Sequence, residues 1–138
     1  LLPVLDLSKF PNTVIDVYIN IIQADAGTRT AGINAAALAL ADAGVPMKDL
    51  VCSVAVGKVG DKICVDLTKE EEDYEESTDL PLAVTPRSGK ITLMQMDGNM
   101  TQKEIKEALE MAKKAIKNIN KVQVEALKEK YKEKVDKK

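Results

Sequence analysis

The chain has no histidine and no tryptophan, and aromatic residues make up only 3% of its 138 positions. Histidine is the usual base of serine and cysteine triads and the commonest zinc ligand, so its absence removes these sites. Any chemistry must therefore depend on carboxylates, arginine or a bound metal. The sequence also lacks an apolar run of about 18 residues, the length that spans a bilayer, and a basic signal-peptide start. We expect a soluble, cytoplasmic protein.

The net charge and the cysteine content are also low. Lys and Arg total 20 against 22 Asp and Glu, so the net charge of -2 argues neither for nor against a nucleic-acid partner. The two cysteines, Cys52 and Cys64, lie in apolar segments that resemble strands. If residues 51–59 and 62–68 form a hairpin, Cys64 faces Gly57 and not Cys52. We expect free thiols and a reducing compartment.

The chain length predicts a single domain over residues 1–138. Residues 1–7 resemble a strand, and the pattern that follows predicts a helix over 14–23. The stretch "TAGINAAALALADAG" is rich in Ala and Leu and ends at Gly44, which predicts a second, buried helix.

Two hairpins and a long helix follow. "VCSVAVGKV" and "KICVDLT" flank Gly60-Asp61, and "LPLAVTP" and "KITLMQM" flank residues 87–89, which predicts an antiparallel or mixed sheet. From Thr101 the pattern is helical, with Glu104 in capping-box register. From there to the end, 12 Lys stand against 7 acidic residues; these lysines form either a solvated helix face or an RNA-facing surface. These elements together predict a fold that contains both helices and strands (α/β), of the α+β type.

A first candidate site is Gly27-Thr28-Arg29, where the alanine-rich helix begins. Free backbone N–H groups and the positive end of the helix dipole favour a phosphate there. Thr28 can add a hydroxyl, and Arg29 a forked pair of donors. Alternatively, Thr28 only caps the helix and Arg29 bonds a neighbouring carbonyl or carboxylate.

A second candidate is the acidic run "DLTKEEEDYEESTD". It contains one lysine and eight carboxylates, which are Asp66, Glu70, Glu71, Glu72, Asp73, Glu75, Glu76 and Asp79. Asp73 and Asp79 bracket a turn before a strand, so they can converge on one site. Such a pair suits Mg²⁺, or one of the two can protonate a leaving group. The alternative is an exposed, mobile acidic loop.

Three segments carry a family resemblance: "QADAGTRTAGINAAALALADAGVPMKDLV", "EEEDYEESTDLPLAV" and "ITLMQMDGNMT". They resemble the ribonuclease PH family, most closely its archaeal exosome branch. The resemblance implies an RNase PH-like fold related to domain 2 of ribosomal protein S5, with a mixed sheet packed against helices. Because family members are longer, it also implies that residues 1–138 form an RNase PH-like domain without its N-terminal half.

The function that this resemblance implies is phosphate-dependent 3′-to-5′ degradation of RNA to nucleoside diphosphates, assisted by Mg²⁺. Gly27, Thr28 and Arg29 match the segment that binds inorganic phosphate. Asp73 and Asp79 match the acidic catalytic pair, of which one is general acid and the other metal ligand. Asp73 is the favoured acid and Asp79 the favoured ligand, with the reverse left open.

The implied partners are single-stranded RNA, a second RNase PH-like subunit in a hexameric ring (a trimer of heterodimers), and RNA-binding cap subunits. A non-catalytic ring subunit, a tRNA-trimming ribonuclease PH, and a phosphate-binding module unrelated to RNA are the alternatives.

Overall fold

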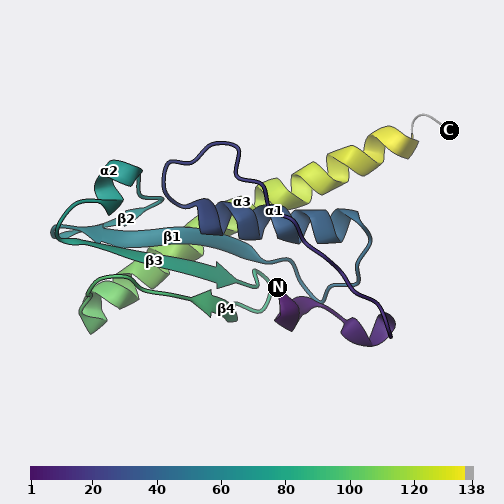
Figure 1. The fold of residues 1–138 in the computed structure, drawn as a ribbon, viewed down its shortest axis with the longest axis horizontal. Helices are drawn as coiled ribbons and strands as arrows, with labels where there is room; N and C mark the ends of the chain where they lie inside the picture. The colour runs from purple at the N-terminus through teal and green to yellow at the C-terminus, as the bar shows by residue number, and fades with distance from the viewer. Residues whose placement is uncertain (136–138) are drawn as a thin grey trace.

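The fold consists of a four-stranded sheet with a helix on each face (Figure 1). The computed structural model describes residues 1–135, with side chains to Lys132. The elements are 3-10 turns at Leu2–Val4 and Leu7–Lys9, α1 (Thr28–Asp42), β1 (Cys52–Val59), β2 (Lys62–Val65), α2 (Lys69–Glu72), β3 (Ser77–Val84), β4 (Ile91–Met94) and α3 (Gln102–Val135).

All strand pairs of the sheet, in the order β2-β1-β3-β4, are antiparallel. Both predicted hairpins are therefore confirmed, and the sheet is antiparallel rather than mixed. Cys64 pairs with Gly57 as expected, whereas Cys52 faces Val84 of β3. Both thiols are free, although only Cys52 is fully buried.

Alternate residues of the central strands point to opposite faces, and each face packs against one long helix. Val54, Val56 and Leu82 pack against Ala112 and Ile116 of α3. On the other face, Val51 and Ala83 pack against Ala37 of α1 and against Val4. The small residues of α1 let this helix lie close to the sheet, which fixes where its N-terminus points.

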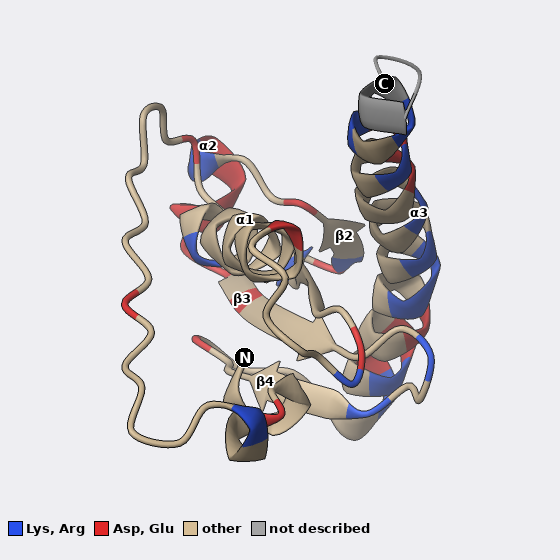
Figure 2. Ribbon diagram, turned by 90° about the vertical axis from the view of Figure 1, so that its right-hand side faces the viewer, with Lys and Arg blue, Asp and Glu red and all other residues tan. Residues whose placement is uncertain are grey.

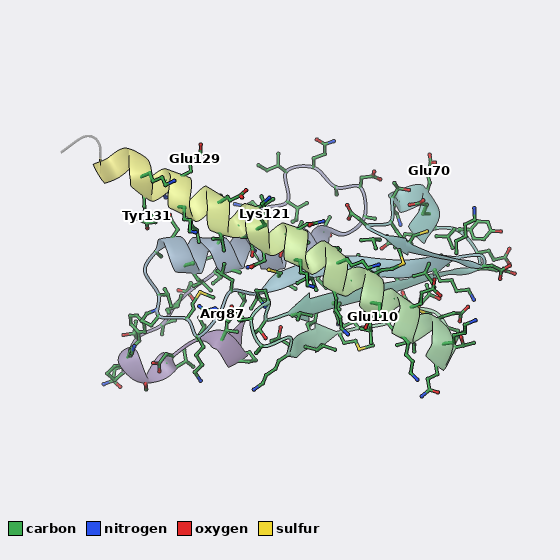
Figure 3. All side chains as sticks on the ribbon, turned by 180° about the vertical axis from the view of Figure 1, so that it is seen from behind. Glu70, Arg87, Glu110, Lys121, Glu129 and Tyr131 are labelled. Atoms are coloured by element: carbon green, nitrogen blue, oxygen red, sulfur yellow. The ribbon has the colours of Figure 1, made fainter. Side chains whose placement is uncertain are left out.

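The long helix α3 begins with the predicted capping box. Glu104 accepts a hydrogen bond from the Thr101 N–H at 2.6 Å, and the Glu104 N–H donates to the Thr101 hydroxyl at 3.3 Å. Near the other end, the Tyr131 hydroxyl donates to the Asp42 carbonyl at 3.0 Å, and Figure 3 shows this side chain between α3 and α1. The capping box stabilises the first turn of α3, and the Tyr131 contact attaches the other end of the helix to α1.

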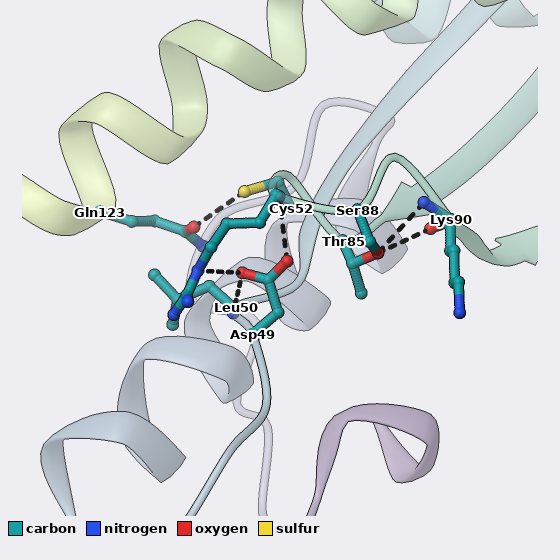
Figure 4. Close-up of polar contacts among 8 residues, drawn as sticks. Asp49, Leu50, Cys52, Thr85, Ser88, Lys90 and Gln123 are labelled. Atoms are coloured by element: carbon teal, nitrogen blue, oxygen red, sulfur yellow. Dashed lines mark hydrogen bonds and ion pairs between the residues drawn. The ribbon is translucent and has the colours of Figure 1, made fainter.

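A buried polar cluster joins the middle of α3 to the sheet. The Cys52 thiol donates to Gln123 Oε1 at 3.0 Å (Figure 4). Gln123 Nε2 donates to the Val51 carbonyl at 3.3 Å. Gln123 is only 3% exposed, so this contact stabilises α3 on the sheet by satisfying groups that burial would otherwise leave unpaired.

The exposed side of α3 carries many lysines with fewer acidic residues among them, as Figure 2 shows. Lys113 pairs with Glu110, and Lys121 pairs with Glu125. This pattern favours a solvated helix face. The last three residues of the lysine-rich end lie outside the described residues.

The N-terminal predictions were wrong. Residues 1–7 form 3-10 turns instead of a strand, because Pro3 occupies the start of the first turn, where its fixed φ fits and no N–H is needed. Residues 14–23 are extended rather than helical. Ile15, Val17, Ile19 and Ile21 recur with period two, and their branched side chains favour extended backbone.

This extended segment, residues 14–22, runs beside the body of the protein (Figure 2). Ile19 contacts α1 where Gly32 leaves room for it; a Cβ at position 32 would lie 3.1 Å from Ile19 Cγ2. Tyr18 and Ile22 are 86% and 98% exposed. Within residues 1–135, no backbone group of this segment hydrogen-bonds another backbone group.

Neither of the long helices among residues 1–135 has the length and apolar character that crossing a membrane requires.

Candidate active site

A polar hollow of about 570 Å³ lies where four parts of the chain meet. These parts are the N-terminus of α1, α2, the first half of β3 and the segment after β4. Its lining residues are Arg29, Lys69, Glu72, Asp73, Ser77, Asp79, Pro81, Gln95, Met96, Asp97 and Gly98. The hollow brings together Arg29, Asp73 and Asp79, which were expected to share a site. A smaller adjoining hollow is lined by Gly27 and Thr28 together with Arg29, Glu72 and Asp79.

The first turn of α1 is open toward this region. Gly27 is the N-cap residue, with φ of +59°, and no side chain caps the helix. Thr28 is the first helical residue, so the alternative in which it only caps the helix does not hold. The Thr30 hydroxyl donates to the Gly27 carbonyl at 2.8 Å and steadies the turn from the inside. The first N–H groups of α1 are therefore available to an anion.

Arg29 lies on the exposed side of this turn. Its Nη1 donates to Gln95 Oε1 at 2.5 Å. Among the described residues no carboxylate lies within ion-pair distance of its guanidinium. The positive charge of Arg29 is thus held in place without being neutralised.

Asp79 is half-buried in β3, between the buried residues Thr78 and Leu80. The Asp79 N–H donates to the Asp97 carbonyl at 2.9 Å, and the Asp97 N–H donates to the Asp79 carbonyl at 2.8 Å. Residues paired in this way project their side chains on the same face of the sheet. Burial raises the pKa of Asp79, as do the charges of Glu72 and Asp97, while Arg29 opposes the shift. This edge of the hollow therefore has an excess of negative charge.

Asp73 has a different environment at the end of α2. The Thr68 hydroxyl and the Glu71 carboxylate form a capping box that folds α2. The acidic run is therefore partly helical, instead of being only a loop. The Asp73 side chain is 62% exposed and pairs with Lys69 Nζ at 2.5 Å, a contact that raises the pKa of Lys69.

Several lining residues were not predicted from the sequence. Gln95 and Asp97 enter the hollow because of the register in which their segment pairs with β3, and Glu72 because of where α2 lies. The sequence revealed neither feature. The capping box of α2 does leave a signal, since Thr68 and Glu71 have the S/T-x-x-E spacing.

The donor set of the hollow can be compared with the needs of Mg²⁺. No three His, Cys, Asp or Glu residues in the described part of the chain are placed to enclose a metal ion. Mg²⁺ commonly uses only one or two carboxylates and takes water and phosphate oxygens for the rest. The crowded carboxylates around Asp79, next to the uncapped N-terminus of α1, fit that mode of binding.

Two family models match the chain. Domain 2 of the 3′ exoribonuclease family matches residues 49–115, and domain 1 matches residues 1–46. The chain belongs to this family, the RNase PH family. The first match contains Asp73 and Asp79, whereas the second contains Gly27, Thr28 and Arg29, so the site combines residues from both.

Curated relatives give the same assignment. The chain is 57% identical over 129 residues to the exosome complex component Rrp41 of Thermococcus kodakarensis, covering 94% of this chain and 51% of the relative. For Thermococcus gammatolerans Rrp41 the identity is 55%, with the same coverage. Methanosarcina mazei Rrp41 is 54% identical over 94% of this chain and 26% of the relative. The chain spans about half the length of the first two.

The crystal structure of rice (Oryza sativa) Rrp46 has the same fold. It matches with a TM-score of 0.72 and 23% identity over 78% of this chain and 51% of that one. The expected RNase PH-like fold class is therefore confirmed.

Proposed function

We propose that this chain forms the phosphate- and metal-binding part of an exosome subunit that degrades RNA from its 3′ end by phosphorolysis. The observation that carries the proposal is the convergence of Arg29 and the open end of α1 with Asp73 and Asp79 in one hollow. The family membership and the identity with Rrp41 proteins support it.

Inorganic phosphate is the proposed co-substrate. The N–H groups at Thr28 and the guanidinium of Arg29 would bind its oxygens and orient one of them toward the terminal phosphodiester of RNA. A bond forms between that oxygen and the terminal phosphorus, and the bond to the 3′ oxygen of the preceding nucleotide breaks. The products are a nucleoside diphosphate and an RNA shortened by one nucleotide.

The acidic pair would complete the reaction. Asp79 is the proposed ligand of Mg²⁺, because a cation there relieves the repulsion among Asp79, Glu72 and Asp97. Bound Mg²⁺ would stabilise the negative charge that develops on the transferred phosphoryl group. Asp73 is the proposed acid that protonates the departing 3′ oxygen, and its ion pair with Lys69 must open for that step.

The proposed partners are single-stranded RNA, a second RNase PH-like subunit in a hexameric ring, and RNA-binding cap subunits. Arg29, Asp73 and Asp79 together favour a catalytic subunit over a purely structural one. The similarity to exosome components favours this role over tRNA trimming. The proposed location is the cytoplasm, which the two free thiols support.

The test uses the native protein with the subunits that co-purify with it, labelled single-stranded RNA, phosphate and Mg²⁺. We expect nucleoside diphosphates only when phosphate is present. Arg29→Ala and Asp79→Asn should each lower the rate at least about a hundredfold, the size typical for a lost transition-state contact. Arg87→Ala and Asp61→Asn are the matched controls, since both residues lie outside the hollow.

Product identity separates the alternatives. Nucleoside monophosphates, or an unchanged rate without phosphate, would rule out phosphorolysis. Full activity in both site variants would show that the residues are wrongly assigned.

A further inference from the structure

The segment that follows β4, residues 95–99, is held rigidly against β3. The Gln95 N–H donates to the Pro81 carbonyl at 3.1 Å, and Asp97 makes two backbone hydrogen bonds with Asp79. The Thr78 hydroxyl donates to the Asn99 carbonyl and accepts from the Asn99 N–H, both at 3.0 Å. This backbone is therefore fixed from Gln95 to Asn99.

Gly98 makes the close approach possible. A Cβ at this position would lie 2.6 Å from Thr78 Oγ1 and 2.8 Å from the Ser77 carbonyl oxygen, and φ is +107°. The segment can lie this close to β3 only with glycine at position 98. As a result, the Gln95 side chain extends into the hollow from a backbone that is fixed by hydrogen bonds.

The partner of Gln95 is Arg29, which comes from a distant part of the sequence. A guanidinium is only a donor, so the Gln95 oxygen must face it; the bond from Nη1 to Oε1 is 2.5 Å long. In the described part of the chain, Gln95 is the one side chain that hydrogen-bonds Arg29. A flexible arginine beside three carboxylates would otherwise turn and pair with one of them.

A neutral acceptor has a specific advantage here. It orients the guanidinium without cancelling its charge, whereas a carboxylate in the same place would form an ion pair that competes with phosphate. Arg29 also lines the smaller hollow beside the N-terminus of α1, together with Gly27 and Thr28, so its remaining N–H groups can donate to a phosphate bound there.

We propose that Gln95 is a positioning residue that keeps Arg29 oriented and electrostatically uncompensated for the incoming phosphate. This inference rests on the proposed phosphorolytic function. Gln95 itself does not contact the reacting atoms; its effect is transmitted through Arg29.

The experiment compares Gln95→Met with the unaltered protein in the native assembly. Methionine keeps the length of the side chain and removes the acceptor. We expect the KM for phosphate to rise about tenfold, the effect of one hydrogen bond to a charged group, with kcat and the KM for RNA within about twofold. Gln102→Met is the matched control, since Gln102 is also exposed but begins α3 outside the hollow.

A double-mutant cycle tests whether Gln95 affects the KM for phosphate through Arg29. In an Arg29→Lys background, Gln95→Met should change the KM for phosphate by less than about twofold, because the forked donor is already gone. An unchanged KM in the single variant would overturn the proposal. Equal effects in both backgrounds would overturn it too, because Gln95 would then act independently of Arg29.

Thermal unfolding of each variant shows whether folding is intact. If the unaltered protein releases no diphosphate, the proposed function fails as a whole. If the unaltered protein does release diphosphate and the cycle shows no coupling between Gln95 and Arg29, only the role of Gln95 fails.

Discussion

Asp79 and Asp97 show how a single pair of residues can work against stability within the site. Asp97, in the segment after β4, lies directly opposite Asp79 of β3 in an isolated antiparallel bridge, and like charges in this position are destabilising. Burial and the neighbouring carboxylates raise the pKa of Asp79, so its surroundings disfavour the charged form of this side chain. Such a cluster is typical of a functional site, since a bound cation would remove the repulsion.

At the same scale, the two cysteines should differ in reactivity. Cys52 is 0% exposed, and burial raises its pKa to about 11, whereas Cys64 is partly exposed. A rise from 9.0 to about 11 lowers the thiolate fraction about a hundredfold. With a maleimide reagent at neutral pH, mass spectrometry should show one rapid label, on Cys64.

Urea-unfolded protein serves as the control and should take two labels. Equal labelling rates in the folded protein would mean that the region around Cys52 opens readily.

The sequence predicted some site residues and not others, for a physical reason. Arg29 was recognisable because it lies two residues after a glycine at the start of a helix, and Asp79 because it ends an acidic run just before the apolar part of a strand. Gln95 and Asp97 carry no such local signal. Their roles arise from the strand register and from the close approach at Gly98, and both are properties of tertiary structure.

At the scale of elements, α3 is attached to the sheet by an ion pair with a clear pH dependence. Lys58 Nζ lies 2.7 Å from Glu104 Oε1. The hydrogen bond from Lys58, followed by those from Thr101, lowers the pKa of Glu104 from 4.5 to about 2. At pH values between these two pKa values, the folded state thus binds fewer protons than the unfolded state. Stability is therefore lost as pH falls from about 5 to about 2.

Glu104→Gln should therefore lower the free energy of unfolding at pH 7, and the difference from the unaltered protein should shrink toward zero near pH 2. Urea unfolding at pH 7, 4 and 3 measures it. Glu110→Gln is the control: Glu110 also pairs with a lysine, but on the exposed side of α3, where solvent screens the pair. A constant difference at all pH values would mean that Glu104 acts by packing alone.

The element that sequence reasoning got wrong is also informative. The helix predicted over residues 14–23 is extended, although the alanine-rich helix and both hairpins were correctly predicted. In α1 and the hairpins, local propensity and packing agree. In residues 14–22, β-branched residues with period two favour a strand, but among the described residues this segment pairs with neither edge strand of the sheet, β2 or β4.

For the molecule as a whole, this segment predicts self-association of the 138-residue chain. Tyr18, Ile22 and Val14 are 86%, 98% and 81% exposed next to unpaired backbone, a combination that favours strand pairing between molecules. Sedimentation equilibrium should show a weight-average mass that increases with concentration. Tyr18→Asp together with Ile22→Asp should keep the chain monomeric to higher concentration without lowering Tm.

Val122→Asp is the control, since Val122 is 65% exposed but lies on α3. If this variant reduced association as much as the double variant, the contact surface would lie on α3 instead.

The half of the hollow around Arg29 and its acidic half fall in different family domains, on either side of residues 46–49. A crossover at this junction between two related genes would join an Arg29 from one parent to an Asp79 and a Gln95 from the other. The hollow would survive such an exchange only if both parents place the end of α1 at the same distance from β3. Chimeras made at this junction and assayed for phosphorolysis would measure how strictly that distance must be kept.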